Sequence, residues 1–403
     1  MMAQRIVIGG CGFAGLWAAL SASRAVALAG RQGDVDVVVV SPAPALVIRP
    51  RLYEAELGGM NPDVSELLAA VGARHVPGVV EAIDDAGRTI TLATLDGTRQ
   101  MIGYDRLVCA TGSQLHRPAI PGLADHAFDT DQLNGATALD AHLRSLDTRT
   151  ASAARNTVVV AGGGSTGLET AMDMPIRLRA ALGRGADFRV ILIDTADRPG
   201  GSLGADPAPY FAEALAFAGV EVRNNARVEA VAEHAVTLSS GEKIETDTLV
   251  WAAGLRASPL AAQIPGEHDA LGRVIVDAWL RAPSANGIFV TGDTAHVATD
   301  DLGNVAAMSC QHALSLGRVG GHNAAAELVG LPLHPYSQPK YVTCVDLGEW
   351  GALYTEGWDR QVRLIRGDAK ALKRDINRVW IYPPKADRDG AFAVANPDYV
   401  VVP

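Results

Sequence analysis

The chain has 403 residues, of which 48% are hydrophobic, so it can bury the cores of two or three domains of ordinary size. Its 45 acidic residues outnumber its 35 basic ones, which gives a formal net charge of -10 at pH 7. So acidic a chain is a poor partner for nucleic acid or for an anionic membrane surface. We expect a compact globular protein with a small, roughly neutral or cationic ligand.

The cysteines and the N-terminus indicate the compartment. Cys11, Cys109, Cys310 and Cys344 include no C-x-x-C pair, so we predict reduced thiols and no metal site. The N-terminus passes from Arg5 into an apolar run without the features of a signal peptide, and no stretch has the length of a membrane span. We expect a cytoplasmic protein, with peripheral contact at the inner face of the membrane as the alternative.

The clearest feature is a pattern of strand, glycine-rich turn, helix and strand that occurs twice, at residues 5–40 and 157–194. A lone G-x-G-x-x-G is weak evidence, but two copies that each lie between a buried-type strand and a helix are much more specific. The fold that this predicts is α/β, with two Rossmann-like dinucleotide-binding domains. The expected elements are strands at 5–8, 35–40, 157–161 and 188–194, and helices at 16–28 and from Leu168 onward.

Each glycine of these turns is needed for a different physical reason. The first permits the tight turn, the second lets the backbone approach a pyrophosphate, and the third lets helix and strand pack closely. Free amides at the start of the helix then face the phosphates. We assign nucleotide binding to Gly10, Gly12, Phe13, Ala14 and Gly15 in the first copy, and to Gly162, Gly164, Ser165, Thr166 and Gly167 in the second.

The two copies differ where the second strand ends, which is where a carboxylate would hold a ribose hydroxyl pair. The second copy ends at Asp194, whose charge would repel a 2′-phosphate and so favours NADH. Arg198 nearby leaves NADPH as an alternative. The first copy ends at the neutral Ser41, so its ligand is expected to be held differently or less tightly at the adenosine end.

Three further segments, at 104–112, 247–254 and 286–293, each have the pattern of a strand that ends in a turn of small residues. With the two glycine turns they resemble the flavoproteins that have two dinucleotide-binding domains, and the order of motifs matches over roughly Arg5 to Val329. The resemblance implies FAD in the first domain and NAD(P)H in the second. It also implies nucleotide contacts at Val80, Ala110, Thr111, Gly112, Ala253, Gly254, Gly292 and Asp293.

Within that superfamily the chain is most similar to type II NADH dehydrogenases, which pass electrons from NADH through FAD to a quinone. The marks are G-G-G-S-T-G-L-E at 162–169, W-A-A-G-L-R-A-S-P-L at 251–260 and R-P-R-L-Y-E at 49–54. The resemblance implies that Glu169 lies near the nicotinamide and flavin; the alternative is a surface carboxylate in a first helical turn. Arg49 and Arg51 either neutralise an FAD phosphate or are solvated.

The chain also departs from that family. Where that family usually has paired glutamines, this chain reads C-Q-H-A-L-S-L-G at 310–317, so Gln311 alone remains. The given sequence also lacks the amphipathic anchor that is usual in that family at its C-terminal end. Gln311 and His312 are our further catalytic candidates at the flavin, although a lone histidine in a helix is commonly just packed. Cys310 and Cys344 invite comparison with sulfide:quinone oxidoreductases, unless both are buried and inert.

The domain organisation that we predict has four segments. The FAD domain takes 1–125 and 263–330, the NAD(P)H domain takes 126–262, and a small α+β domain that shapes the acceptor pocket takes 331–403. In the last we expect strands at 341–347, 351–355 and 361–365, and an amphipathic helix at 368–382. Its apolar residues Ala369, Leu372, Ile376 and Val379 would dock on their own domain or touch a membrane, opposite Lys370, Lys373, Arg374 and Arg378.

The function that these features favour is a ping-pong reaction in which NADH reduces FAD and the flavin then reduces a quinone or quinone-like acceptor. Three alternatives stay open: a soluble flavin oxidoreductase acting on a small organic substrate, a sulfide:quinone-type enzyme, and an NADH-responsive sensor. A nucleotide-binding scaffold without FAD is a further alternative. We also expect a homo-oligomer.

Overall fold

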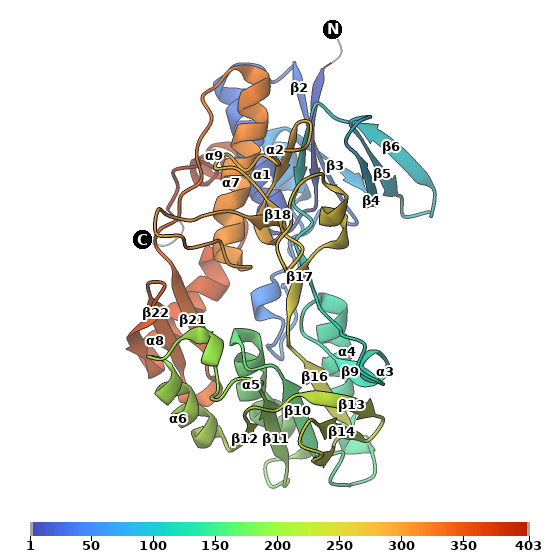
Figure 1. Ribbon diagram of the computed structural model, residues 1–403, viewed down its shortest axis with the longest axis vertical. Helices are drawn as coiled ribbons and strands as arrows, with labels where there is room; N and C mark the ends of the chain where they lie inside the picture. Colours follow the sequence, from blue (N-terminus) through green and yellow to red (C-terminus); the bar gives the residue numbers. More distant parts are fainter. Residues whose placement is uncertain (1–2, 401–403) are drawn as a thin grey trace.

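The computed structural model describes residues 3–400, and the N-terminal part of the chain forms a parallel five-stranded sheet (Figure 1). The strand order is β19-β7-β1-β2-β3. Ile6 and Ile8 lie in the core that contains helices α1 and α7, whereas Val7 faces the core on the other side of the sheet. The bounds are β1 Gln4–Gly9, α1 Phe13–Leu28, β2 Val35–Ser41, β3 Ala73–Pro77, β7 Arg106–Cys109, β19 Ile288–Val290 and α7 Cys310–Val329.

A second parallel sheet, of order β12-β11-β10-β16-β9, lies at the other end of the molecule (Figure 1). Its strands are rich in β-branched residues because both faces are covered, as parallel sheets require. The bounds are β9 Ala127–Phe128, α4 Leu133–Arg144, β10 Thr157–Ala161, α5 Ser165–Leu182, β11 Arg189–Ile193, α6 Ala208–Ala218, β12 Val220–Arg223 and β16 Thr248–Trp251. Two parallel sheets, with glycine turns after β1 and β10, confirm the predicted α/β fold class.

Smaller elements complete and connect these two sheets. A three-stranded antiparallel sheet extends from each, and the pair β8 and β17 runs between the two domains (Figure 1). The bounds are α2 Ser65–Val71, β4 Val79–Asp84, β5 Thr89–Ala93, β6 Arg99–Gly103, β8 Ser113–Leu115, α3 Leu123–His126, β13 Val228–Ala232, β14 Ala235–Leu238, β15 Lys243–Glu245, β17 Leu255–Ala257, β18 Val274–Ile275 and β20 Ala295–His296.

The C-terminal part spans the side of both parallel-sheet domains (Figure 1). Three antiparallel strands, β21 Val342–Asp346, β22 Ala352–Glu356 and β23 Gln361–Ile365, lead into helix α8 Arg366–Asp375. A π-helical turn at Ile376–Trp380 continues α8, and helix α9 Arg388–Val394 follows. Strand β21 and helix α5 are in contact, which brings this part against the second glycine turn.

The amphipathic helix predicted at 368–382 needs a correction. Helix α8 ends at Asp375, and a π turn follows it over the rest of the predicted helix. The buried side of this segment carries Ala369, Lys373 and Asn377. Val379, expected on the apolar face, is 65% exposed. Periodicity failed because Lys373, assigned to the polar face, has a buried carboxylate partner from another element.

No helix in residues 3–400 is both long and apolar enough to cross a bilayer.

Candidate functional site

One large cavity, of about 1210 Å³, lies where the two nucleotide domains and the C-terminal part meet. It reaches both glycine turns, one from each parallel-sheet domain. Its wall also includes the start of α7, strand β21 and the π turn. A single space bounded by all three parts is suited to holding two ligands with their reactive ends together.

The first glycine turn is built as its spacing predicted. Gly10 has φ +111°, which favours glycine, and a Cβ on Gly15 would lie 2.0 Å from the carbonyl oxygen of Gly10. Gly12 has open space where its Cβ would be. Gly15 therefore allows the close packing of helix α1 against strand β1. The predicted residues that line the cavity here are Gly10, Gly12, Phe13, Ala14, Ser41, Ala110, Thr111, Gly112, Gly292 and Asp293.

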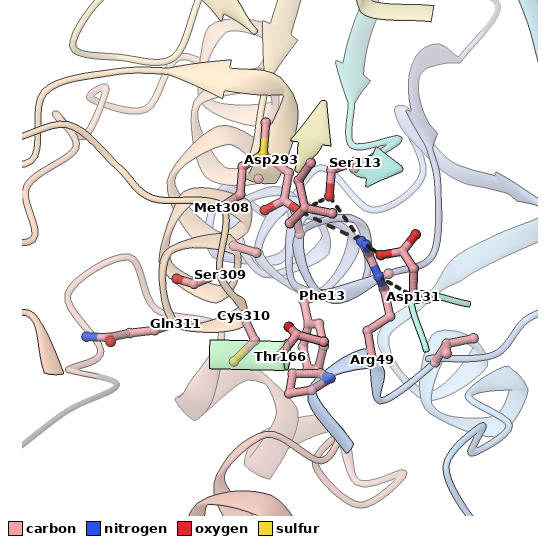
Figure 2. A pocket seen from close by; sticks show the side chains of 18 of the residues that line it. Phe13, Arg49, Ser113, Asp131, Thr166, Asp293, Met308, Ser309, Cys310 and Gln311 are labelled. Carbon is pink, nitrogen blue, oxygen red and sulfur yellow. Dashed lines mark hydrogen bonds and ion pairs between the residues drawn. The ribbon is translucent and has the colours of Figure 1, made fainter. Parts of the chain in front are cut away.

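A charged cluster lines this half of the cavity (Figure 2). Asp293 accepts a hydrogen bond of 2.6 Å from the Ser113 hydroxyl and lies 3.7 Å from the Arg49 guanidinium, which also pairs with Asp131. Burial raises the pKa of Asp293, although Ser113 and Arg49 lower it. Asp293 lines the cavity next to Ser113 and Arg49, and Arg49 carries the cluster's positive charge.

Two predicted contacts of the first nucleotide lie away from the cavity. Arg51 is bound to Glu54 at 2.7 Å and donates to the Tyr382 hydroxyl at 2.8 Å, so of the two candidate arginines only Arg49 lines the cavity. The side chains of Arg49 and Arg51 point in different directions because the two residues lie two positions apart on the 3-10 helical turn at 49–51. Val80 packs against the core near Gly9 instead.

The second glycine turn repeats this geometry. Gly162 has φ +117°, and a Cβ on Gly167 would lie 1.7 Å from the carbonyl oxygen of Gly162. Gly163, which the fingerprint spacing did not single out, is needed because a Cβ there would meet the Asp194 carboxylate at 1.9 Å. Of the predicted residues, Gly164, Ser165, Thr166 and Gly254 line the cavity, whereas Gly162, Gly167, Asp194 and Ala253 do not.

Glu169 lines the cavity one turn into α5 and is 7% exposed, so it is not a surface carboxylate. Its Oε1 lies 2.8 Å from Nζ of Lys373 and accepts the backbone N–H of Asp346 at 3.0 Å. Burial raises the pKa of Glu169, an effect that Lys373 opposes. Burial alone would lower the pKa of Lys373, but Glu169 raises it above its usual value. We infer an ionised, buried pair that faces the cavity.

Lys373 is therefore a site residue that sequence reasoning missed. It lies far from Glu169 in the sequence, on a helix whose other cations are mostly solvated. Lys370, one turn earlier, is paired with Asp346, so β21 connects the two lysines to α5. The only available signal was Lys373 itself, four residues after the buried Ala369 on the same helical face.

Asp173, the next carboxylate on the same face of α5, has an unusual proton affinity. Its Oδ2 is buried and has no hydrogen-bond partner among residues 3–400. Burial raises its pKa to about 7, Arg177 opposes this rise, and Asp346 and Glu54 add to it. The native state therefore holds a proton on Asp173 that the unfolded chain has already lost above about pH 4.

We expect this proton to make stability fall between about pH 4 and pH 7, because the native state binds more protons than the unfolded state in that window. Asp173→Asn should remove the fall and stabilise the protein at pH 8, by a few kcal/mol at most, with little effect at pH 4. Urea unfolding at both pH values measures the difference. Asp368→Asn, at an exposed position on α8, is the matched control, and equal shifts in both variants would contradict the assignment.

The two catalytic candidates at the start of α7, Gln311 and His312, differ in whether they line the cavity. Gln311 lines the cavity, and its amide donates to the carbonyl oxygen of Lys340 at 3.5 Å (Figure 2). His312 is fully buried, does not line the cavity, and is bonded through Nδ1 to the Ser309 hydroxyl at 2.9 Å. Burial, with help from Arg360 and Arg273, lowers the pKa of His312 to about 4. His312 is thus packed, which is the alternative that the sequence left open, and a role for it as a proton donor at the flavin stays a prediction.

Cys310 and Cys344 both line the cavity as free thiols. Burial raises the pKa of Cys310 to about 11 and that of Cys344 to about 12. Both are thus protonated near neutral pH, and a thiol is a far weaker nucleophile than a thiolate. No group of metal-binding side chains occurs within residues 3–400.

The family model for pyridine nucleotide-disulphide oxidoreductases matches residues 4–317. The chain belongs to this family. A relative in Mycobacterium tuberculosis (strain ATCC 25618 / H37Rv), the NADH dehydrogenase-like protein Rv1812c, is 44% identical over 98% of both chains. The demethylphylloquinone reductase NdbB of Synechocystis is 30% identical over 88% of this chain and 85% of that protein.

Solved structures agree on the fold. NDH2 from Plasmodium falciparum in complex with NADH superimposes with a TM-score of 0.78 at 13% identity, covering 97% of each chain. The predicted resemblance to type II NADH:quinone oxidoreductases is therefore confirmed at the level of family, and this member of the pyridine nucleotide-disulphide oxidoreductases is an oxidoreductase.

Proposed function

We propose that this oxidoreductase binds FAD at the first glycine turn, takes a hydride from NADH at the second, and passes the electrons to a quinone or quinone-like acceptor. The observation that carries the proposal is the continuity of the cavity from Gly12 to Ser165 and Glu169. One space that touches both nucleotide turns allows a nicotinamide and a flavin to meet.

The residues present fit FAD. Gly12 and Gly112 leave open space where a side chain would otherwise stand, next to the amides at the start of α1, which suits a pyrophosphate. Asp293 and Arg49 can hold the hydroxyl and phosphate groups that lie between flavin and adenosine. Bound FAD would supply the hydride-accepting ring, and the adenosine end would meet the neutral Ser41.

The residues around the second turn fit NADH. Gly164 also leaves open space, and the amides of Ser165 and Thr166 begin α5 beside it. Asp194, packed behind the turn, supplies the carboxylate for a ribose hydroxyl pair and disfavours a 2′-phosphate. We therefore expect the dinucleotide to extend from this turn toward Glu169.

Glu169 and Lys373 provide the polar groups near the proposed meeting point of donor, flavin and acceptor. Reduction of a quinone to a quinol takes up a proton in addition to the hydride of NADH. The Lys373 ammonium, held at 2.8 Å from Glu169, can donate a hydrogen bond to a developing oxyanion, and Glu169 keeps that ammonium charged. Gln311, which also lines the cavity, adds a neutral amide.

An acceptor panel tests the second half of this proposal. Enzyme reduced anaerobically would be mixed with a water-soluble ubiquinone analogue, a menaquinone analogue, oxygen or buffer, while flavin absorbance is followed. We expect reoxidation by a quinone to be at least tenfold faster than by oxygen. Because two cysteines line the cavity, sulfide is included as an electron donor to oxidised enzyme. Slow reoxidation by every quinone would reject the proposed acceptor.

A further inference from the structure

Ser41 ends strand β2 of the first sheet, at the position that corresponds to Asp194 after β11 in the second. It lines the cavity and is 5% exposed. The first glycine turn lies beside it, because the backbone N–H of Gly10 donates to the carbonyl oxygen of Val40 at 2.9 Å. A neutral hydroxyl group therefore occupies the place that a ribose-binding carboxylate takes in many dinucleotide folds.

His75, on the neighbouring strand β3, contacts both oxygen atoms of Ser41. Its Nε2 lies 3.0 Å from the Ser41 carbonyl oxygen and 3.0 Å from the Ser41 hydroxyl oxygen. A carbonyl oxygen can only accept, so this contact is a hydrogen bond only when the ring proton is on Nε2. Burial lowers the pKa of His75, and the bond to Ser41 and the nearby Asp63 offset this only in part. His75 is therefore a neutral imidazole whose Nε2–H is shared between the two oxygens.

These contacts fix what the Ser41 hydroxyl group can still bind. A hydroxyl group has one donor and two acceptor sites. The proton of Ser41 goes to the carbonyl oxygen of Ala43 at 2.7 Å, and one lone pair accepts from His75, so one lone pair remains. The Cys11 thiol also lies beside Ser41 and lines the cavity, but a thiol is a weak donor that competes poorly with a hydroxyl group. Ser41 can therefore accept a hydrogen bond from one ligand hydroxyl group.

A carboxylate would recognise a ribose differently. It has two oxygens with about four lone-pair sites, so it can hold both hydroxyl groups of the sugar at once. Within residues 3–400, the carboxylates that line the cavity are Asp131, Glu169 and Asp293, and each has a cationic partner described above. The single lone pair of Ser41 is thus the acceptor that the end of β2 offers to the cavity.

We propose that Ser41 accepts a hydrogen bond from a single ribose hydroxyl group at the adenosine end of FAD, and that His75 is the positioning residue that fixes the accepting lone pair. Without the Nε2–H of His75, the hydroxyl group of Ser41 keeps only its bond to Ala43 and is free to turn about it. The identity of the ligand as FAD rests on the proposed function.

The role of Ser41 is tested by titrating the flavin-free full-length protein with FAD and with its 2′-deoxyadenosine and 3′-deoxyadenosine analogues, while flavin fluorescence is followed. The wild type should bind one analogue roughly 3- to 10-fold more weakly than FAD and the other nearly as well, because one neutral hydrogen bond is lost. Ser41→Ala should bind all three ligands with the same affinity. Ser41→Asp should bind both analogues more weakly than FAD, since a carboxylate holds both hydroxyl groups.

His75→Phe isolates the positioning role, because it leaves Ser41 in place. A merely structural role for His75 would lower the melting temperature and preserve the difference in affinity between FAD and the weaker analogue. We expect instead that this difference falls below about twofold, since the hydroxyl group is no longer held. His75→Gln, whose amide N–H can replace the Nε2–H, should restore part of the difference. Arg74→Gln, at an exposed position on the same strand that pairs with Asp36, is the matched control and should behave as the wild type.

Each part of the proposal has its own contrary result. Equal affinity of the wild type for FAD and both analogues, or weak binding of both analogues, would overturn the single-hydroxyl role of Ser41. An undiminished difference in His75→Phe would overturn the role of His75. If the wild type does not bind FAD at all, the proposed function fails as well. If FAD binds with the expected differences but NADH does not reduce it, the proposed function alone is rejected.

Discussion

Lys373→Met is expected to lower the free energy of unfolding by about 3–5 kcal/mol and to abolish most acceptor reduction. Lys373 and Glu169 are each 8% exposed at the side chain, and they form a 2.8 Å ion pair in the wall of the cavity. Removing one partner leaves an uncompensated charge away from water, so Glu169 would take up a proton. Urea unfolding and steady-state turnover measure the two effects.

A double variant separates stability from function. Glu169→Gln with Lys373→Met removes both charges, so most of the lost stability should return while activity stays low. The control is Arg179→Met, which breaks an exposed pair with Glu349 and should cost no more than about 1 kcal/mol. If the double variant regains activity along with stability, the pair is structural and its assigned role is wrong.

Gly167→Ala and Gly164→Ala are expected to have opposite effects, although they lie three residues apart. A methyl group on Gly167 would meet the Gly162 carbonyl oxygen at 1.7 Å, so α5 must shift, at a cost of about 1–3 kcal/mol in stability. A methyl group on Gly164 meets nothing within 4 Å. It should leave stability unchanged and instead occupy space that a phosphate needs, which weakens NADH binding.

The first turn offers the same comparison for the flavin. Gly15→Ala, 2.0 Å from the Gly10 carbonyl oxygen, should destabilise the fold, and Gly12→Ala, with open space, should lower only the flavin content of the purified protein. Melting temperature and the ratio of flavin to protein absorbance measure the two effects. Normal flavin content and normal NADH affinity in Gly12→Ala and Gly164→Ala would show that neither turn approaches a phosphate.

Strands of both the parallel and the antiparallel sheets could be predicted because their signals are local. Strand β10 spans the predicted 157–161 and strand β23 the predicted 361–365, since each is a short β-branched or apolar run bounded by turns. The helices begin earlier than predicted, at Phe13 and Ser165, because the first turn of each is formed by the end of its glycine motif. Periodicity shows the body of a helix more clearly than its start.

The acceptor side could not be predicted in the same way, because its contacts join distant segments. Nothing near Lys373 in the sequence indicates Glu169 as its partner, so a buried cation was placed on a solvated face. Arg49 and Arg51 are indistinguishable in sequence, yet only Arg49 reaches the cavity. His312 and Gln311 are adjacent and differ in the same way. Side-chain direction depends on the packing of whole elements.

Anaerobic reduction of the purified protein by NADH tests the central claim most directly. The yellow protein would be mixed with NADH or NADPH in a stopped-flow instrument while flavin absorbance near 450 nm is recorded. We predict rapid and complete bleaching by NADH, and slower bleaching by NADPH because Asp194 disfavours a 2′-phosphate. A protein that carries flavin but is not bleached by NADH would contradict the account.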